Sequence, residues 1–138
     1  MTGVTATQLE GRANRFGWGA VCSAVGHVAV LAISIVAALD SDGDPATAFW
    51  YWVGFAASGL VAALLLWAAA REVARGQASS SRIALSGVAL VVAAVFAVLS
   101  ALADNDLAFL IVPVSLGALN LVLLLAIRSL ASERVSVG

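Results

Sequence analysis

The chain has one histidine, which lies in an apolar stretch, "VCSAVGHVAVL", that runs from residue 21 to residue 31. An imidazole in such a place can do three kinds of chemistry. A neutral ring can hydrogen-bond and hold helices together. A titrating ring can relay protons or bind a substrate, and a bare ring nitrogen can ligate a metal or haem. We favour the first role for His27 and keep the other two as alternatives.

Three other polar side chains accompany His27 within apolar sequence. Ser23 and Ser34 share a narrow stripe with His27 if this segment is a helix, which turns by 100° per residue. Asn120 lies at a similar depth in the last apolar run, where we expect it to join helices, with a substrate contact as the alternative. The imidazole should therefore hydrogen-bond Asn120, Ser23 or a backbone carbonyl.

The acidic stretch "DSDGDP" begins like a calcium-binding loop, with Asp40, Asp42 and Asp44 at alternate positions. Pro45 and Tyr51 then occupy the positions where that loop needs glycine and glutamate. We expect a solvated acidic turn, with weak binding of a divalent cation as the alternative. The sequence contains no metal-ligand cluster, no nucleophile–base pair and no phosphate-binding glycine loop, so it predicts no enzyme, no bound metal and no cofactor.

The composition indicates an integral membrane protein. Of the 138 residues, 62% are hydrophobic and 11% are charged, whereas a soluble domain has about 25% charged residues. A net charge of −1 provides no basic surface for nucleic acid. The expected surroundings are therefore the lipid bilayer, and Cys22 should be a small buried apolar residue.

Four apolar runs are long enough to span that bilayer. They cover residues 18–39, 48–70, 83–103 and 107–127. As helices they would be about 32–35 Å long, which matches a hydrocarbon core of about 30 Å. Backbone groups in lipid must be satisfied internally, so each run should be a helix. We predict an all-α integral membrane protein, with residues 1–138 forming one four-helix bundle.

The charges predict the orientation of these spans. All seven cations are arginines, and all lie before the first run, between the second and third, or after the fourth. The positive-inside rule makes that side cytoplasmic, with both termini on it. Short acidic turns would then join the runs into two antiparallel hairpins. Arginine without lysine is typical of a GC-rich genome, so we expect a multi-pass protein of a prokaryotic plasma membrane.

Local signals predict two helix ends. Thr7 and Glu10 have the spacing of a capping box, so a short helix is expected before the first span, with a frayed tail as the alternative. Gly76 should end the second helix.

Small residues at four-residue spacing predict where helices pack closely, because close approach of small side chains drives association in lipid. The residues expected in such packing are Gly54, Ser58, Ala62, Ala89, Ala93 and Ala97.

Two functions remain after this reading. The first is a non-catalytic accessory or scaffold subunit that associates through its small-residue helix faces, either with itself or within a larger membrane complex. The second is a small homo-oligomeric transporter or channel in which His27 and Asn120 line the path. We favour the first, because this sequence supplies packing surfaces and lacks reacting groups.

Overall fold

The computed structural model describes residues 5–40, 47–77, 80–104 and 110–137. These residues form four helices, α1 (Ala6–Leu39), α2 (Thr47–Ala74), α3 (Ser80–Asp104) and α4 (Ile111–Val137), and no strand. Each helix is long and apolar enough to cross a membrane. The predicted all-helical fold is confirmed, and the four apolar helices are consistent with a multi-pass membrane protein.

The helices are longer than the apolar runs within them, mainly at the end that carries the arginines. α1 has 34 residues and is about 51 Å long, which exceeds a hydrocarbon core of about 30 Å. Its first three turns are part of the bundle, because Leu9 and Ala13 are fully buried. The segment before the first apolar run is therefore a continuous part of α1, and the expected short separate helix is absent.

The predicted cap of this segment was wrong by two residues. Thr5 Oγ1 accepts a hydrogen bond from the Gln8 backbone N–H at 3.2 Å, and Gln8 Oε1 accepts one from the Thr5 N–H at 3.0 Å. This is a capping box with glutamine as its second residue. Because the helix begins at Ala6, Thr7 already lies within its first turn and cannot cap it.

Gly76 ends α2 as predicted. Its φ of +82° is in the left-handed region, which glycine adopts at no steric cost. The Gly76 N–H donates to the Val73 carbonyl at 3.0 Å, and the Gln77 N–H donates to the Glu72 carbonyl at 2.9 Å. These two bonds satisfy carbonyls at the end of the helix.

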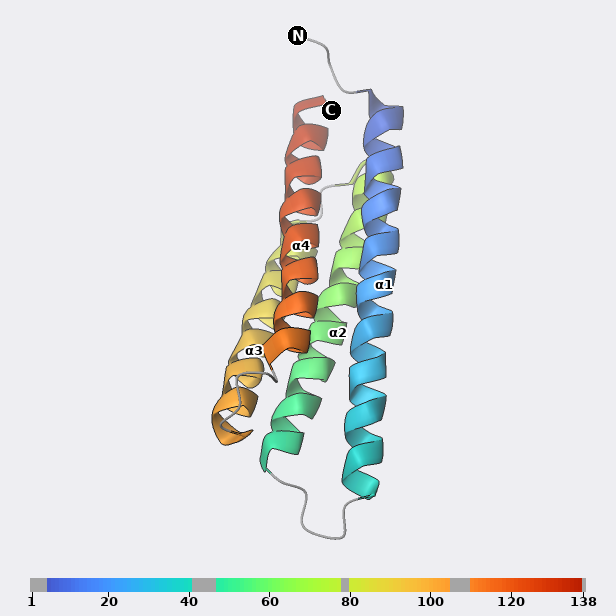
Figure 1. Ribbon diagram of the computed structural model, residues 1–138. Helices are drawn as coiled ribbons and strands as arrows, with labels where there is room; N and C mark the ends of the chain where they lie inside the picture. The colour runs from blue at the N-terminus through green and yellow to red at the C-terminus, as the bar shows by residue number, and fades with distance from the viewer. Residues whose placement is uncertain (1–4, 41–46, 78–79, 105–109, 138) are drawn as a thin grey trace.

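α2 is the central helix of the bundle (Figure 1). It makes its most extensive contacts with α1 and α3, which lie on its two sides, while α4 packs less extensively on all three. The start of α1 and the end of α4 lie at the same end of the bundle. The apolar core has one cluster toward that end, around Leu66 and Ile127, and a second toward the other end, around Phe55.

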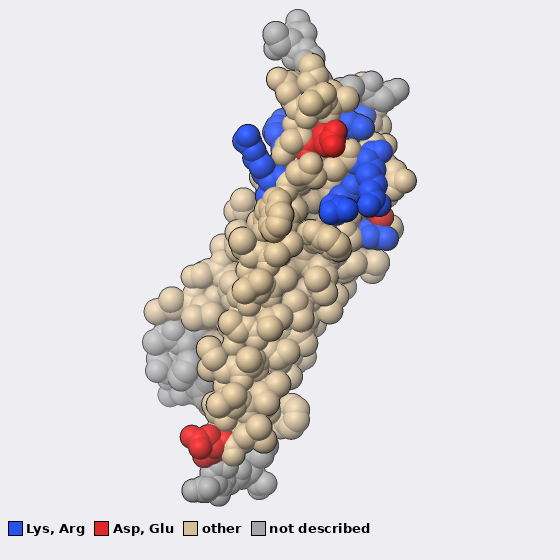
Figure 2. Space-filling view, turned by 90° about the vertical axis from the view of Figure 1, so that its right-hand side faces the viewer, with Lys and Arg blue, Asp and Glu red and all other residues tan. Residues whose placement is uncertain are grey.

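The charged residues are segregated along the bundle. The arginines lie at one end, as Figure 2 shows, and Asp40 follows α1 at the other. Arg12 pairs with Glu133 at 3.2 Å, and Arg82 pairs with Glu72 at 2.9 Å, so ion pairs join α1 to α4 and α3 to α2. Seven arginines and three glutamates leave the arginine end with a net charge of +4.

Candidate functional site

Ser23, His27 and Asn120 meet in the interior of the bundle. Their side chains are 0%, 1% and 1% exposed. Ser23 and His27 are one turn apart on α1 and share its buried face. The Ser23 hydroxyl donates to Asn120 Oδ1 of α4. The Nδ1 of His27 lies 2.8 Å from the Ser23 carbonyl oxygen. These three residues form what we call the polar cluster.

α2 completes the polar cluster through a backbone group. Asn120 Nδ2 donates to the Gly59 carbonyl at 3.3 Å. A Cβ atom at position 59 would overlap the Nε2 and Cδ2 atoms of His27, so only glycine allows the ring to lie there without a shift. Sequence reasoning missed Gly59. Its only signal was its place in an apolar run at a depth similar to that of His27.

Two aromatic side chains of α2, which belong to the core cluster around Phe55, lie on the imidazole side of that cluster. The His27 and Phe55 ring centroids are 5.4 Å apart, with the rings tilted by 43°. Trp52 packs edge-on against Phe55, with 6.2 Å between centroids. This geometry suits aromatic contact and fixes the orientation of the imidazole.

A cavity of about 430 Å³ ends at the polar cluster. Its walls come mainly from α3 and α4, and His27 and Asn120 are the polar residues among those lining it. Gly117 lies on its wall, and a Cβ atom there would meet nothing within 4 Å. We call this space the midbundle cavity.

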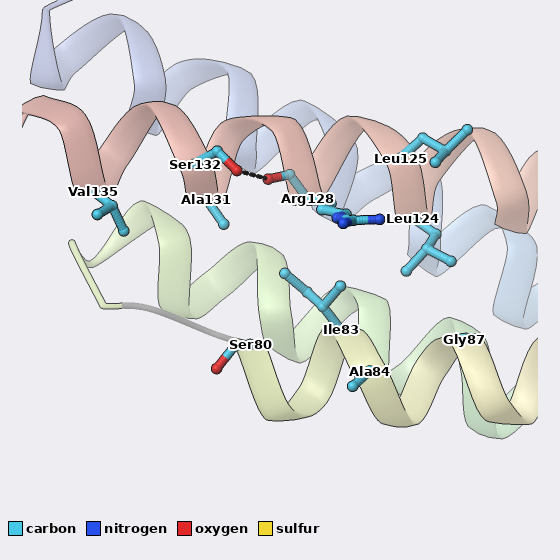
Figure 3. Close-up of a pocket in the computed structure, with 10 residues that line it drawn as sticks. All are labelled: Ser80, Ile83, Ala84, Gly87, Leu124, Leu125, Arg128, Ala131, Ser132 and Val135. Atoms are coloured by element: carbon cyan, nitrogen blue, oxygen red, sulfur yellow. Dashed lines mark hydrogen bonds between the residues drawn. The ribbon is translucent and has the colours of Figure 1, made fainter.

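A second cavity lies between α3 and α4 toward the arginine end and measures about 540 Å³ (Figure 3). Ile83 and Leu124 point toward the gap from the two helices. Arg128 also lines it, and Ser132 Oγ donates to the Arg128 carbonyl at 3.1 Å. The α3–α4 seam is therefore open at two levels.

The remaining predicted polar residue, Ser34, does not join the cluster. It is half-buried, and its hydroxyl donates to the Val30 carbonyl of its own helix at 2.8 Å. Cys22 was expected to be buried but is exposed. It is one residue before Ser23, and the 100° step turns it from the cluster toward the outer surface.

The predicted small residues pack inside the chain. Gly54 approaches Phe96 closely enough that a Cβ atom would lie 2.7 Å from the ring. The burial of the other five small residues depends on the helix face on which each one lies. Ala62, Ala93 and Ala97 are buried, while Ser58 and Ala89 are half-buried.

Candidate metal ligands are not gathered in the part of the chain that the structure describes, which has no group of three or more histidine, cysteine, aspartate or glutamate residues around one point. Most of the predicted calcium-loop start, Asp42, Asp44 and Pro45, lies outside the described residues. No protein-family model matches this chain, and no curated protein or solved structure matches it either. Functional inference therefore depends on the residues themselves.

Proposed function

We propose that this chain is a multi-pass protein of a prokaryotic plasma membrane, built as two antiparallel helical hairpins with both termini in the cytoplasm. The support is the charge distribution. All arginines fall at one end of the bundle, and positively charged ends stay in the cytoplasm during insertion. The exposed apolar side chains along the helices, such as Ile33 and Val91, then face lipid.

Within that membrane, we propose that the protein acts as a non-catalytic accessory or scaffold subunit of a larger complex. One observation carries this proposal, namely that Asn120 of α4 is bonded both to Ser23 of α1 and to the Gly59 carbonyl of α2. In lipid, such bonds stabilise helix association by roughly 0.6–2 kcal/mol each. The polar cluster then serves to keep a rigid surface, and a scaffold needs such a surface.

The alternative is a homo-oligomeric transporter with a path between protomers. Its support is the midbundle cavity, which reaches His27 and Asn120. Against it, both residues are 1% exposed in the single chain, so a path along the outside of the bundle would not meet them.

The first test is the native mass of the protein after gentle extraction, with bound species identified. We expect a foreign membrane subunit at fixed stoichiometry. His27→Ala should lower the stability of this complex without changing its composition, and Ser34→Ala is the control outside the polar cluster. A pure homo-oligomer whose solute flux disappears with His27→Ala would instead establish the transporter.

A further inference from the structure

A groove near the arginine end combines one accessible charge with apolar walls. It is the cavity of about 540 Å³ between α3 and α4, and we call it the α3–α4 groove. Ile83 is 9% exposed and Leu124 is half-buried, whereas Leu125 and Arg128 are exposed. All four residues line the groove. A molecule that enters it therefore meets apolar side chains and one guanidinium that faces outward.

The Arg128 guanidinium makes no ion pair within the described part of the chain. The ion pairs there use Glu72 and Glu133, each with another arginine. Arg128 is also the one charged residue among those that line the groove. In Figure 3 its side chain extends along the gap in the direction of Leu124. A guanidinium without a counter-charge suits an anion, and it can hold a phosphate through two parallel N–H donors.

The lining of the groove changes from apolar to polar at the depth where a membrane changes. The apolar runs that are expected to cross the hydrocarbon core begin at residue 83 in α3 and end at residue 127 in α4. The polar residues that line the groove, Ser80, Arg128 and Ser132, lie outside these runs, whereas Leu124 and Leu125 lie inside them. The groove therefore offers its charge at the level of the lipid phosphates and its apolar part at the level of the acyl chains.

Charge and volume restrict the ligand further, to a phospholipid with one anionic phosphate. One arginine matches the single phosphate of phosphatidylglycerol, whereas the two phosphates of cardiolipin would need a second cation in the groove. The net charge of +4 at the arginine end disfavours a headgroup that carries an ammonium group. The volume of about 540 Å³ exceeds the approximately 150 Å³ of an apolar cavity that holds benzene, so part of an acyl chain fits.

We propose that the α3–α4 groove binds a lipid of the phosphatidylglycerol type, with its phosphate on the Arg128 guanidinium and one acyl chain along Leu124 and Gly87. Gly87 leaves room for the chain, because a Cβ atom there would contact only Leu124, at 3.9 Å. Basic pockets between spanning helices bind anionic headgroups of the cytoplasmic leaflet, which is the leaflet at the arginine end in the proposed orientation. The site requires that the helices span a membrane and does not depend on the scaffold role.

Native mass spectrometry of the full chain in detergent micelles counts bound lipids one at a time. The protein is titrated with phosphatidylglycerol and, separately, with phosphatidylethanolamine that has the same acyl chains. We expect one phosphatidylglycerol to bind at least about fivefold more tightly than phosphatidylethanolamine, equivalent to about 1 kcal/mol. Glycerol 3-phosphate carries the phosphate without acyl chains and should not displace the lipid at the same concentration.

Two pairs of variants locate the lipid. Arg128→Gln removes the phosphate ligand and should weaken phosphatidylglycerol binding at least about fivefold. Arg75→Gln is the matched control, since Arg75 is exposed at the same end and does not line the groove, and it should change binding less than about twofold. Gly87→Leu fills the apolar part and should also weaken binding, whereas Gly11→Leu, at a helical glycine with nothing within 4 Å of a built Cβ, should not. If Gly87→Leu fails to fold, the two arginine variants still decide.

Four results would overturn the proposal. An equal loss of affinity in Arg128→Gln and Arg75→Gln would show attraction to the net charge of the arginine end. Equal binding of the two lipids would show that the headgroup charge is not recognised. Displacement by glycerol 3-phosphate would show an anion site that does not use the acyl chain. Unchanged affinity in a folded Gly87→Leu protein would place the chain elsewhere.

Discussion

Replacement of Gly59 by alanine tests how the imidazole is held. The new methyl group would overlap the His27 ring, and overpacking of this kind destabilises proteins by about 1–3 kcal/mol. A shift of the helices would also weaken the hydrogen bond from Asn120 to the Gly59 carbonyl. Loss of this bond would lower the free energy of unfolding by about 0.6–1.7 kcal/mol more. The helix propensity of alanine offsets up to about 1 kcal/mol. With the full offset, we expect a net loss of about 0.6–3.7 kcal/mol.

The assay is reversible unfolding in mixed micelles, followed by the fluorescence of the four tryptophans. Gly117→Ala is the matched control, since its methyl group enters open space and should leave stability unchanged or raise it by up to about 1 kcal/mol. A double-mutant cycle with His27→Ala isolates the clash. Without the ring, Gly59→Ala should cost almost nothing. An equal cost with and without His27 would refute the close approach of the two residues.

Two further predictions concern the polar cluster and the orientation. Ser23→Ala removes the bond to Asn120 and should lower the unfolding free energy by about 0.6–1.7 kcal/mol, while Ser34→Ala, whose bond is local, should change it by less than about 0.5 kcal/mol. Equal effects would contradict the cluster. In a Cys22→Ala background, Asp40→Cys should react with an impermeant maleimide on intact cells, and Gln77→Cys only after permeabilisation. The reverse pattern would place the arginine end outside.

Much of the fold could be predicted from the sequence, because it depends on the length, the apolarity and the spacing of residues along a single segment. Run length and apolarity predict four helices, and the 100° step predicts that Ser23 and His27 share a face. The pairing within the polar cluster was less accessible. Asn120 bonds Ser23 and the backbone of Gly59. Of the three partners left open from the sequence, the imidazole has the Ser23 carbonyl at 2.8 Å and the Ser23 hydroxyl at 3.5 Å.

Other features depend on how separate helices are rotated against one another, which a single sequence does not encode in its periodicity. Gly59 faces His27 only because α1 and α2 cross with those two residues in contact. Cys22 was assigned to the interior on residue type alone, although its place beside Ser23 already turned it outward. The midbundle cavity required the spacing of α3 from α4.

The buried interhelical hydrogen bonds are unevenly distributed among the four helices. Side-chain hydrogen bonds in the bundle interior tie α1 to α4 and α4 to α2. α3 adds no side chain to the polar cluster: Ser86 donates to the Ile83 carbonyl of its own helix at 2.7 Å, and the buried Ser100 hydroxyl has no partner among the described residues. In its membrane-spanning part, α3 is held to α2 mainly by close packing of small and apolar residues, and its contact with α4 is looser.

In lipid, such packing lacks a hydrophobic driving force. The buried hydrogen bonds described above do not cross the α3–α4 seam. Both cavities lie along this seam. The same division makes α1, α2 and α4 one hydrogen-bonded unit, to which α3 is attached by packing alone in its membrane-spanning part.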